Sequence, residues 1–452
     1  MPQVRHPFGS ATFEVMRERR RRDRPIEWPD WFVPKRYPHF DQPIRSPDQV
    51  RSLVETPGQV ATRAFLPFIR FEKTGRKFKK GEGRFVKKPR DLKYASHTDS
   101  QILRRYALLL ANRYEQIIIN EGIAESVLAY RRLDPPRCNI HFANDAFHWI
   151  ETKAPRVALT FDVRDFFESF DHRLLKHQWK AVLGVKELPP DHYNIFKAIT
   201  RYSWVERDEL FKRFSITKKK LKDWREPICT PEQFRAVVRR GSPEPGLIHR
   251  KTDGKGVPQG SPISALLSNV YMLPVDRRMA ALARDRDGLY LRYSDDILLV
   301  CRPDVKRDFV TELEQAISDA KLELHDGLGK RSVCNVSRDP SARLVCEPPL
   351  QYLGFSFDGR TVRIRSQTVA KFLRRMRKAV RRERHLAAVR AEAGGDPRVR
   401  RKSLYSRYTH LGRRNFITGY AADARAVFRR NSICDQLKRH WRELAAALEV
   451  DE

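Results

Sequence analysis

Two apolar runs of strand length flank a short acidic segment in the second half of the chain. Residues 289–292 (LYLR) and 297–300 (ILLV) are rich in aliphatic and aromatic side chains, as buried β-strands are. Between them lies the tetrapeptide YSDD (293–296). A polar tetrapeptide between two such runs is typical of the turn of a β-hairpin. The pattern therefore predicts a hairpin that carries two adjacent carboxylates, Asp295 and Asp296.

Patterns elsewhere predict a mixed α+β chain. Residues 157–163 (VALTFDV) have the character of a strand, and apolar residues recur at helical spacing from Ile102 to Ile119, after a capping sequence at 98–100. The segment 74–93 interleaves Lys and Arg with Gly and Phe, which predicts a basic β-hairpin. Further helical patterns cover 263–272 and 310–320, short strands are predicted at 350–357 and 361–364, and a basic helical region begins at Ser366.

The charge of the chain indicates a polyanionic partner. Its 452 residues include 90 Lys and Arg against 56 Asp and Glu, which gives a formal net charge of +34. Nucleic acid is the usual partner of so basic a protein, although solvated basic faces would give the same composition. The six cysteines form no C-x₂-C pair, so we expect no zinc site, no disulfide framework and a cytoplasmic location. No apolar run approaches the roughly 18 residues of a membrane helix, so no membrane association is expected.

The acidic pair suits a cation, but acidic turns are also common on protein surfaces. Asp295 and Asp296 repel each other unless cations neutralise them, and hard oxygen ligands of this kind suit Mg²⁺. Alone, the tetrapeptide fits a solvated turn better. Asp162, in the predicted strand 157–163, supplies a carboxylate from a distant part of the sequence. Nucleotidyl transfer uses two metal ions about 3.5 to 4 Å apart, bridged by carboxylates from separate strands, and Asp162 with Asp295 would supply that arrangement.

Four segments in a fixed order link these carboxylates to a known family. They are FDVRDFF (161–167), GVPQGSPISALLSN (256–269), YSDD (293–296) and LGF (353–355). In this order the chain resembles a reverse transcriptase of the bacterial lineage that includes group II intron, retron and phage-defence enzymes. The resemblance covers roughly residues 65–375 and implies an RNA-directed DNA polymerase, which is a nucleotidyltransferase.

The resemblance implies roles for the carboxylates and the metal. Asp162, Asp295 and Asp296 would be the catalytic residues, with Asp162 and Asp295 as the principal metal ligands and Asp296 as a more peripheral one. The backbone carbonyl of Val163 would add a metal ligand at the nucleotide site. The expected cofactor is a pair of Mg²⁺ ions, with Mn²⁺ as a substitute.

Nucleotide-binding positions follow from the same resemblance. Phe167 would lie against the sugar and clash with a 2′-hydroxyl, so that deoxynucleotides are selected; a plain core phenylalanine is the alternative. Gln259 and Gly260 would lie beside the incoming nucleotide and the template base, Gly260 because backbone must approach closely there.

Basic residues at three positions are expected to meet the triphosphate. Lys88 and Arg90 match the basic positions of the fingers in such enzymes. Lys330 matches a lysine held near the triphosphate, where a cation would stabilise the leaving group; a solvated loop lysine is the alternative.

The remaining matched positions would hold the primer and the duplex. Leu353 and Gly354 match the primer grip. The helical tail places basic residues on successive turns, which fits a thumb that binds a duplex by its phosphates, with a solvated helix as the alternative. These nucleic-acid-binding residues are Arg374, Arg375, Arg377, Lys378 and Arg381.

The predicted fold is an α+β right-hand polymerase. Residues 1–64 would form an N-terminal basic arm and residues 65–155 the fingers. Residues 156–365 would form the palm, an antiparallel sheet with the YSDD hairpin, interrupted by an insertion of the fingers at about 180–255. Residues 366–452 would form a helical basic thumb or RNA-binding region.

The leading hypothesis for function is DNA synthesis on an associated noncoding RNA in antiphage defence. FANDAF (142–147), YASHTDSQI (94–102) and AYR (129–131) are more similar to stand-alone defence-associated enzymes than to intron enzymes. The alternative is a group II intron maturase that aids splicing and retrohoming. A protein that only binds RNA is disfavoured by the intact carboxylates and Gln259, and an RNA-dependent RNA polymerase is disfavoured by Phe167. Expected partners are the RNA template, the DNA product and dNTPs, and a homo-oligomer is left open.

Overall fold

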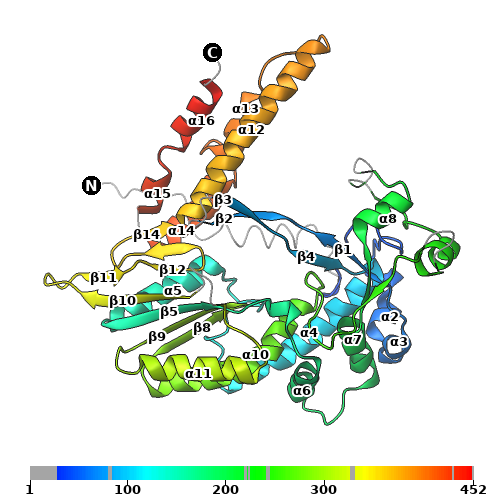
Figure 1. Ribbon diagram of the computed structural model, residues 1–452, viewed down its shortest axis with the longest axis horizontal. Helices are drawn as coiled ribbons and strands as arrows, with labels where there is room; N and C mark the ends of the chain where they lie inside the picture. Colours follow the sequence, from blue (N-terminus) through cyan, green and yellow to red (C-terminus); the bar gives the residue numbers. More distant parts are fainter. Residues whose placement is uncertain are drawn as a thin grey trace.

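A five-stranded antiparallel sheet, in the order β11-β10-β5-β9-β8, forms the palm of the computed structural model (Figure 1). Its strands are β5 (Arg156–Asp162), β8 (Leu289–Tyr293), β9 (Asp296–Cys301), β10 (Ser332–Arg338) and β11 (Leu344–Glu347). The structure describes residues 28–79, 84–217, 221, 224–240, 245–325, 331–429 and 432–449.

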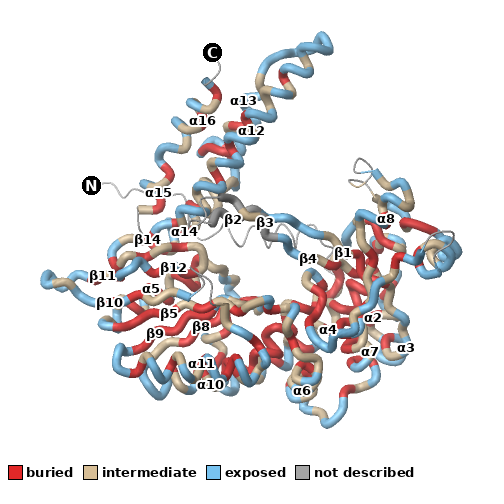
Figure 2. The backbone as a smooth tube through the Cα atoms, viewed as in Figure 1, coloured by how far each residue is buried: buried red, intermediate tan, exposed pale blue. Residues whose placement is uncertain are grey.

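Side chains of the palm sheet alternate between two cores. Leu159 of β5 is buried in a core that includes α10 and α11, whereas its neighbour Ala158 is buried in a second core that includes α5. Both faces of the sheet are therefore covered, and this is why its central strands have nearly continuous apolar sequences. Figure 2 shows the resulting buried stretches along β5, β8 and β9. The helices are α5 (Asn139–Lys153), α6 (His172–Leu183), α10 (Ser264–Asp285) and α11 (Lys306–Asp319).

A four-stranded sheet, in the order β4-β1-β6-β7, lies at the centre of the fingers. Strand β6 pairs in parallel with β1, with Val205 opposite Ile69, so part of the segment 180–255 joins the fingers sheet. Strands β2 and β3 form a separate two-stranded ribbon. The strands are β1 (Phe68–Glu72), β2 (Gly75–Lys79), β3 (Arg84–Lys88), β4 (Asp91–Tyr94), β6 (Ser203–Glu206) and β7 (His249–Arg250). The helices are α2 (Arg51–Glu55), α3 (Pro57–Thr62), α4 (His97–Asn120), α7 (Pro190–Thr200), α8 (Arg207–Arg213) and α9 (Pro231–Gln233).

The described part of the predicted N-terminal arm packs into the fingers. Trp31 and Phe32 are buried in the same core as α4 and α10, so the segment from Trp28 onward packs against these helices. Its periodicity was too weak to show this, because it contributes isolated anchors rather than a regular apolar face.

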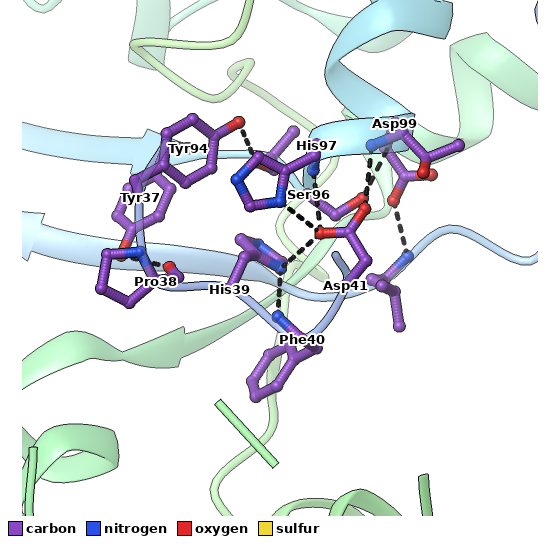
Figure 3. Close-up of polar contacts among 12 residues, drawn as sticks. Tyr37, Pro38, His39, Phe40, Asp41, Tyr94, Ser96, His97 and Asp99 are labelled. Carbon is purple, nitrogen blue, oxygen red and sulfur yellow. Dashed lines mark hydrogen bonds and ion pairs between the residues drawn. The ribbon is translucent and has the colours of Figure 1, made fainter. Parts of the chain in front are cut away.

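Asp41 connects this segment to the start of α4 (Figure 3). Its carboxylate accepts hydrogen bonds from the backbone N–H groups of His97 (3.0 Å) and Thr98 (2.8 Å), and lies 2.8 Å from Nδ1 of the His97 ring. The N-cap of α4 is Ser96, which accepts from the Asp99 N–H at 3.1 Å, instead of the predicted sequence at 98–100. Asp41 thus satisfies two N–H groups that a helix start leaves free.

A small three-stranded sheet and a set of helices complete the chain. Its strands are β12 (Leu350–Tyr352), β13 (Phe355–Phe357) and β14 (Val362–Ile364), in the order β12-β13-β14. In Figure 1 the long helix α12 rises from this sheet with α16 beside it. The helices are α12 (Ser366–Glu392), α13 (Arg401–Tyr408), α14 (Ala422–Phe428), α15 (Ser432–Leu437) and α16 (His440–Glu449).

The α+β fold class with an antiparallel palm sheet and a YSDD hairpin is confirmed. Strands β10 and β11 were not predicted. Among the described residues, none of the helices is long and apolar enough to cross a membrane. All six cysteines are free.

Candidate active site

The acidic turn joins β8 to β9 as a hairpin with a two-residue loop. Tyr293 pairs with Asp296, so Ser294 and Asp295 form the loop itself. Ser294 has a positive φ of 62°, which is uncommon for a residue with a side chain. Asp295 is half-buried, whereas Asp296 is exposed. The sequence thus gives the two carboxylates different environments although they are adjacent.

Asp162 ends β5, and the sheet register places it directly opposite Asp296. Side chains at opposite positions of paired strands are about 4.5 to 5.5 Å apart at Cβ, and like charges there destabilise the pair. The next N–H group, that of Val163, donates to the carbonyl oxygen of Asp295 at 3.1 Å. The three predicted catalytic carboxylates therefore lie together where β5 ends and β9 begins, along one edge of the palm sheet formed by strand ends.

A further chain segment fixes the end of β5 from its other side. Arg164 N–H donates to the carbonyl oxygen of Glu323, and His325 N–H donates to that of Asp162, both at 2.8 Å. Val163 forms a bridge with Leu324 between these two bonds. The carbonyl oxygen of Val163, a predicted metal ligand, is the acceptor in neither bond.

The donor set suits hard divalent cations. Carboxylate oxygens are the ligands that Mg²⁺ prefers, and a cation would relieve the repulsion between Asp162, Asp295 and Asp296. Within the part of the chain that the structure describes, no three His, Cys, Asp or Glu side chains converge to hold a metal by themselves.

The loop 256–260 packs on the turn that follows Asp162. Val257 N–H donates to the carbonyl oxygen of Phe167, and Gly256 N–H to that of Phe170, both at 2.8 Å. A Cβ atom on Gly256 would lie 2.6 Å from the carbonyl oxygen of Glu168, so only glycine allows this approach. The ring of Phe167 is half-buried, with centroids 5.4 Å from Phe166 and 5.9 Å from Phe170.

The same loop contacts the fingers through its last residues. Lys93 N–H donates to the carbonyl oxygen of Gln259 at 2.8 Å. Gly260 has a φ of 104°, and a Cβ there would lie 2.9 Å from the carbonyl oxygen of Lys93. Gln259 and Gly260 are thus held between the palm and β4, while Gly260 is exposed.

Lys93 is a basic residue at this junction that sequence reasoning did not single out. Its side chain is buried, with Nζ 2.6 Å from Asp91 and 5.7 Å from the centroid of the Tyr202 ring. The alternation of inward and outward side chains along β4 could have indicated this residue, because Lys93 takes an inward position between more exposed neighbours.

The predicted triphosphate residues are described unequally. Arg90 is exposed, and its backbone exchanges two hydrogen bonds with that of Lys73. Lys88 ends β3, but its side chain lies outside the described residues. Lys330 lies outside them altogether.

Leu353 and Gly354 form the two-residue turn between β12 and β13. Their φ values of 45° and 93° are both positive, as in a type I′ turn. Asn139 Nδ2 donates to the carbonyl oxygen of Leu353 at 2.9 Å, and Arg365 N–H donates to that of Gly354 at 3.0 Å. Tyr352, just before the turn, is buried, which raises its pKa, and Asp296 acts in the same direction.

Helix α12 has an apolar stripe and a basic exposed face. Phe372, Met376 and Val380, spaced four residues apart, are buried against the other helices of the thumb. All five predicted nucleic-acid-binding residues are exposed, and Arg374, Lys378 and Arg381 point away from the stripe at helical spacing. Arg377 forms an ion pair with Glu443 of α16 at 2.7 Å, and Nε of Arg374 donates to the carbonyl oxygen of Ala370 at 3.2 Å.

A buried ion pair lies beneath the YSDD hairpin and was not predicted. Arg292 of β8 donates to both carboxylate oxygens of Asp276 in α10, at 2.7 and 2.6 Å, and both side chains are fully buried. Burial opposes the charge of Arg292, but Asp276 outweighs it and raises the pKa of the guanidinium. Tyr290 also donates to Asp276, at 2.7 Å. No spacing rule in the sequence relates residues on a strand to residues on an earlier helix.

The family model described as "Reverse transcriptase (RNA-dependent DNA polymerase)" matches residues 100–357, which is more than half of the chain. The chain therefore belongs to the reverse transcriptase family. The matched segment contains Asp162, the loop 256–260, the YSDD hairpin and the Leu353-Gly354 turn. No curated protein matches the sequence significantly.

Solved structures with similarity to this chain include telomerases. Telomerase from Candida albicans in complex with a TWJ fragment of telomeric RNA is 11% identical, with 73% of this chain and 52% of that chain covered and a TM-score of 0.40. Apo telomerase from Candida tropicalis truncated from its C-terminal domain is 12% identical, with 66% of this chain and 57% of that chain covered and a TM-score of 0.35. This chain thus spans about half the length of these structures.

Proposed function

We propose that this protein is an RNA-directed DNA polymerase that uses two Mg²⁺ ions. The observation that carries the proposal is the meeting of Asp162, Asp295 and Asp296 at one edge of the palm sheet, within a chain of the reverse transcriptase family. When bound, the ions would activate the primer hydroxyl and neutralise the triphosphate.

The chain's own residues would set the position of these ligands. The hydrogen bond from Val163 to Asp295 ties the acidic turn to the end of β5, so the two segments that carry the carboxylates cannot shift independently. Asp296 is the most exposed of the three and would serve as the peripheral carboxylate. The assignment of Asp162 and Asp295 as principal ligands stays a prediction.

Selection of deoxynucleotides would fall to Phe167. Its ring is held by Phe166 and Phe170, and its carbonyl oxygen is bound by Val257, so neither the side chain nor the backbone can easily withdraw. A ring fixed in this way beside the sugar would exclude a 2′-hydroxyl. Gln259 and Gly260 would meet the base pair, because their loop is anchored to both the palm and the fingers.

The duplex would lie between the grip turn and the exposed face of α12. Leu353 and Gly354 would hold the primer end, and Arg374, Lys378 and Arg381 would bind backbone phosphates. Arg377 would contribute less, since its charge is already balanced by Glu443.

We also propose that the template is a dedicated noncoding RNA and that the biological role is antiphage defence. The segments 94–102, 129–131 and 142–147 support this proposal through their resemblance to stand-alone defence enzymes. A maturase of the group II intron type is the competing function, and it requires intron RNA as the partner.

Primer extension with purified protein tests the activity. Wild type should add dNTPs to a primer on an RNA template in the presence of Mg²⁺. Asp295→Asn should abolish the addition because it removes one carboxylate. It should leave the affinity for primer–template nearly unchanged because it removes no contact to a phosphate. Asp287→Asn is the matched control, since Asp287 is paired with Lys153 and Arg156 outside the site. Full activity of Asp295→Asn would refute the site.

Sequencing of the RNA that copurifies with the protein tests the role. One enriched structured RNA that is copied into DNA would support the defence proposal. Enrichment of intron RNA with its splice boundaries would replace it by the maturase function.

A further inference from the structure

Ser294, the first residue of the catalytic turn, is held from two sides by side chains outside the carboxylate site. Nη1 of Arg292 donates to its carbonyl oxygen at 3.3 Å. Its hydroxyl lies 3.1 Å from the hydroxyl of Tyr130. Ser294 is itself buried, so water cannot readily replace either partner.

Asn269 of α10 closes these contacts into a ring. Its Oδ1 accepts from Nη1 of Arg292 at 3.2 Å, and its Nδ2 donates to the carbonyl oxygen of Ala129 at 2.9 Å. Ala129 directly precedes Tyr130, so the ring runs from Arg292 through Asn269 and the 129–130 backbone to Ser294 and back. Asn269 and Arg292 are fully buried, and the Asp276 ion pair fixes the orientation of Arg292.

The backbone conformation at both ends of the hydroxyl contact is a costly one. Ser294 and Tyr130 both have a φ of 62°. A residue with a side chain in this region persists only where its surroundings hold it, at a cost of order 1 to 3 kcal/mol. The next residue after Ser294 is Asp295, whose carbonyl oxygen accepts the hydrogen bond of Val163. Any relaxation of Ser294 would therefore move Asp295 relative to Asp162.

We propose that Tyr130, Asn269 and Arg292 are positioning residues that act through Ser294 to hold Asp295 in register with Asp162. This inference rests on the proposed polymerase function.

Tyr130→Phe and Ser294→Ala are the sharpest variants. Tyr130 is 46% exposed, so loss of its hydroxyl should not impair folding. Each variant should lower the single-turnover rate of nucleotide addition by about 3- to 10-fold, the range for loss of one neutral hydrogen bond. The double variant should be no slower than the slower single one, since both remove the same bond. The Kd for the nucleotide should stay within about twofold.

Hydrogen exchange supplies a readout that does not depend on activity. Amides of residues 291–298 should exchange faster in Tyr130→Phe and in Ser294→Ala, by about the same 3- to 10-fold, because the turn opens more often. Tyr193→Phe is the matched control, since Tyr193 is also exposed (37%) and lies on α7; it should alter neither quantity. Arg292→Lys keeps the charge but loses the planar fork, and should lower the rate by about 10- to 100-fold.

The outcomes separate the two proposals. A wild-type protein that adds no nucleotide on any template would sink the polymerase function, and the exchange experiment alone would then decide the positioning role. Unchanged rates and unchanged exchange in both hydroxyl variants would overturn the positioning role. The positioning role would also be overturned if the losses of rate in the two single variants added up in the double variant. A loss of rate accompanied by faster exchange throughout the protein would overturn it as well.

Discussion

Acidification should loosen the contact between the N-terminal segment and the fingers, because His39 is buried in its neutral form. The ring of His39 is fully buried, and its Nδ1 accepts the N–H of Phe40 at 2.8 Å (Figure 3). Burial lowers the pKa of His39 to about 3; Asp41 acts in the opposite direction but only partly offsets the effect. Protonation of Nδ1 would also turn the acceptor of this hydrogen bond into a donor.

The sign and size of the effect follow from linkage. A histidine whose pKa is about 3 when folded and 6.5 when unfolded binds fewer protons in the folded state, so stability falls as the pH drops through 6.5. Between pH 7.5 and 5.5 the loss is about 1.4 kcal/mol, a factor of about ten in the opening equilibrium. Burial raises the pKa of Asp41, but bonds from His97 and Thr98 and the nearby His39 lower it further, to below its ordinary value. Its contribution is lost only in more acidic solution and is constant in this window.

Native-state hydrogen exchange at His97 and Thr98 measures the effect, because Asp41 binds both N–H groups. Their protection factors, corrected for intrinsic rates, should fall about tenfold between pH 7.5 and 5.5. His39→Asn keeps a side-chain acceptor for Phe40 without a titrating group, and its protection should be flat over this range. His148→Asn, at a 73% exposed side chain, should behave as wild type. A flat wild-type profile, or a full decrease in His39→Asn, would refute the reasoning.

Three further predictions concern the proposed polymerase site. Phe167→Val should raise the kcat/KM for ribonucleotides relative to deoxynucleotides by about 10- to 100-fold, and an unchanged ratio in single-nucleotide assays would remove the gating role. Gly260→Ala should slow nucleotide addition by about 100-fold, because the new Cβ atom would press on the Lys93 backbone. Gly254 also has a positive φ but has open space around it, so Gly254→Ala should add nucleotides at nearly the wild-type rate. Equal rates in the two variants would contradict this reasoning. Replacement of Arg374, Lys378 and Arg381 by Gln should reduce the slope of log affinity against log salt by about 2 to 3 in anisotropy titrations. An unchanged slope would show that these residues are only solvated.

Local sequence patterns were sufficient where a segment's own side chains determine its structure. The hairpin around Asp295 was predictable because both flanking strands are buried on two faces and are therefore mostly apolar, with Arg292 as the charged exception. Strands β10 and β11 were missed for the opposite reason. In β10 only Cys334 and Val336 are buried; the exposed Asn335 lies between them, and polar residues follow Val336. Such a segment is identified as a strand only once it pairs with β5.

The side chains that support the site could not be found in this way. Asp41 caps a helix that begins 56 residues later, and Arg292 meets Asn269 and Asp276 on a helix that precedes its strand. No periodicity connects such pairs, because their proximity results from the packing of whole elements. The carboxylates could be predicted from the sequence only because the order of the motifs identified the family. The supporting residues Asp41, Asn269 and Arg292 could not, because no role is attached to them in those motifs.

The linker between α4 and α5 reaches both functional turns of the palm. Tyr130 contacts Ser294 of the catalytic turn, and Asn139, at the start of α5, binds the carbonyl oxygen of Leu353 in the grip turn. Each turn contains a residue other than glycine at positive φ, Ser294 in one and Leu353 in the other, and an outside side chain binds each of them. Because one short segment supplies both partners, a shift of this linker would disturb both turns, and with them the positions of the proposed metal ligands and of the proposed primer grip. The conformation of residues 126–139 therefore bears directly on the alignment of the primer end with the carboxylates, although none of these residues is itself part of the catalytic motifs.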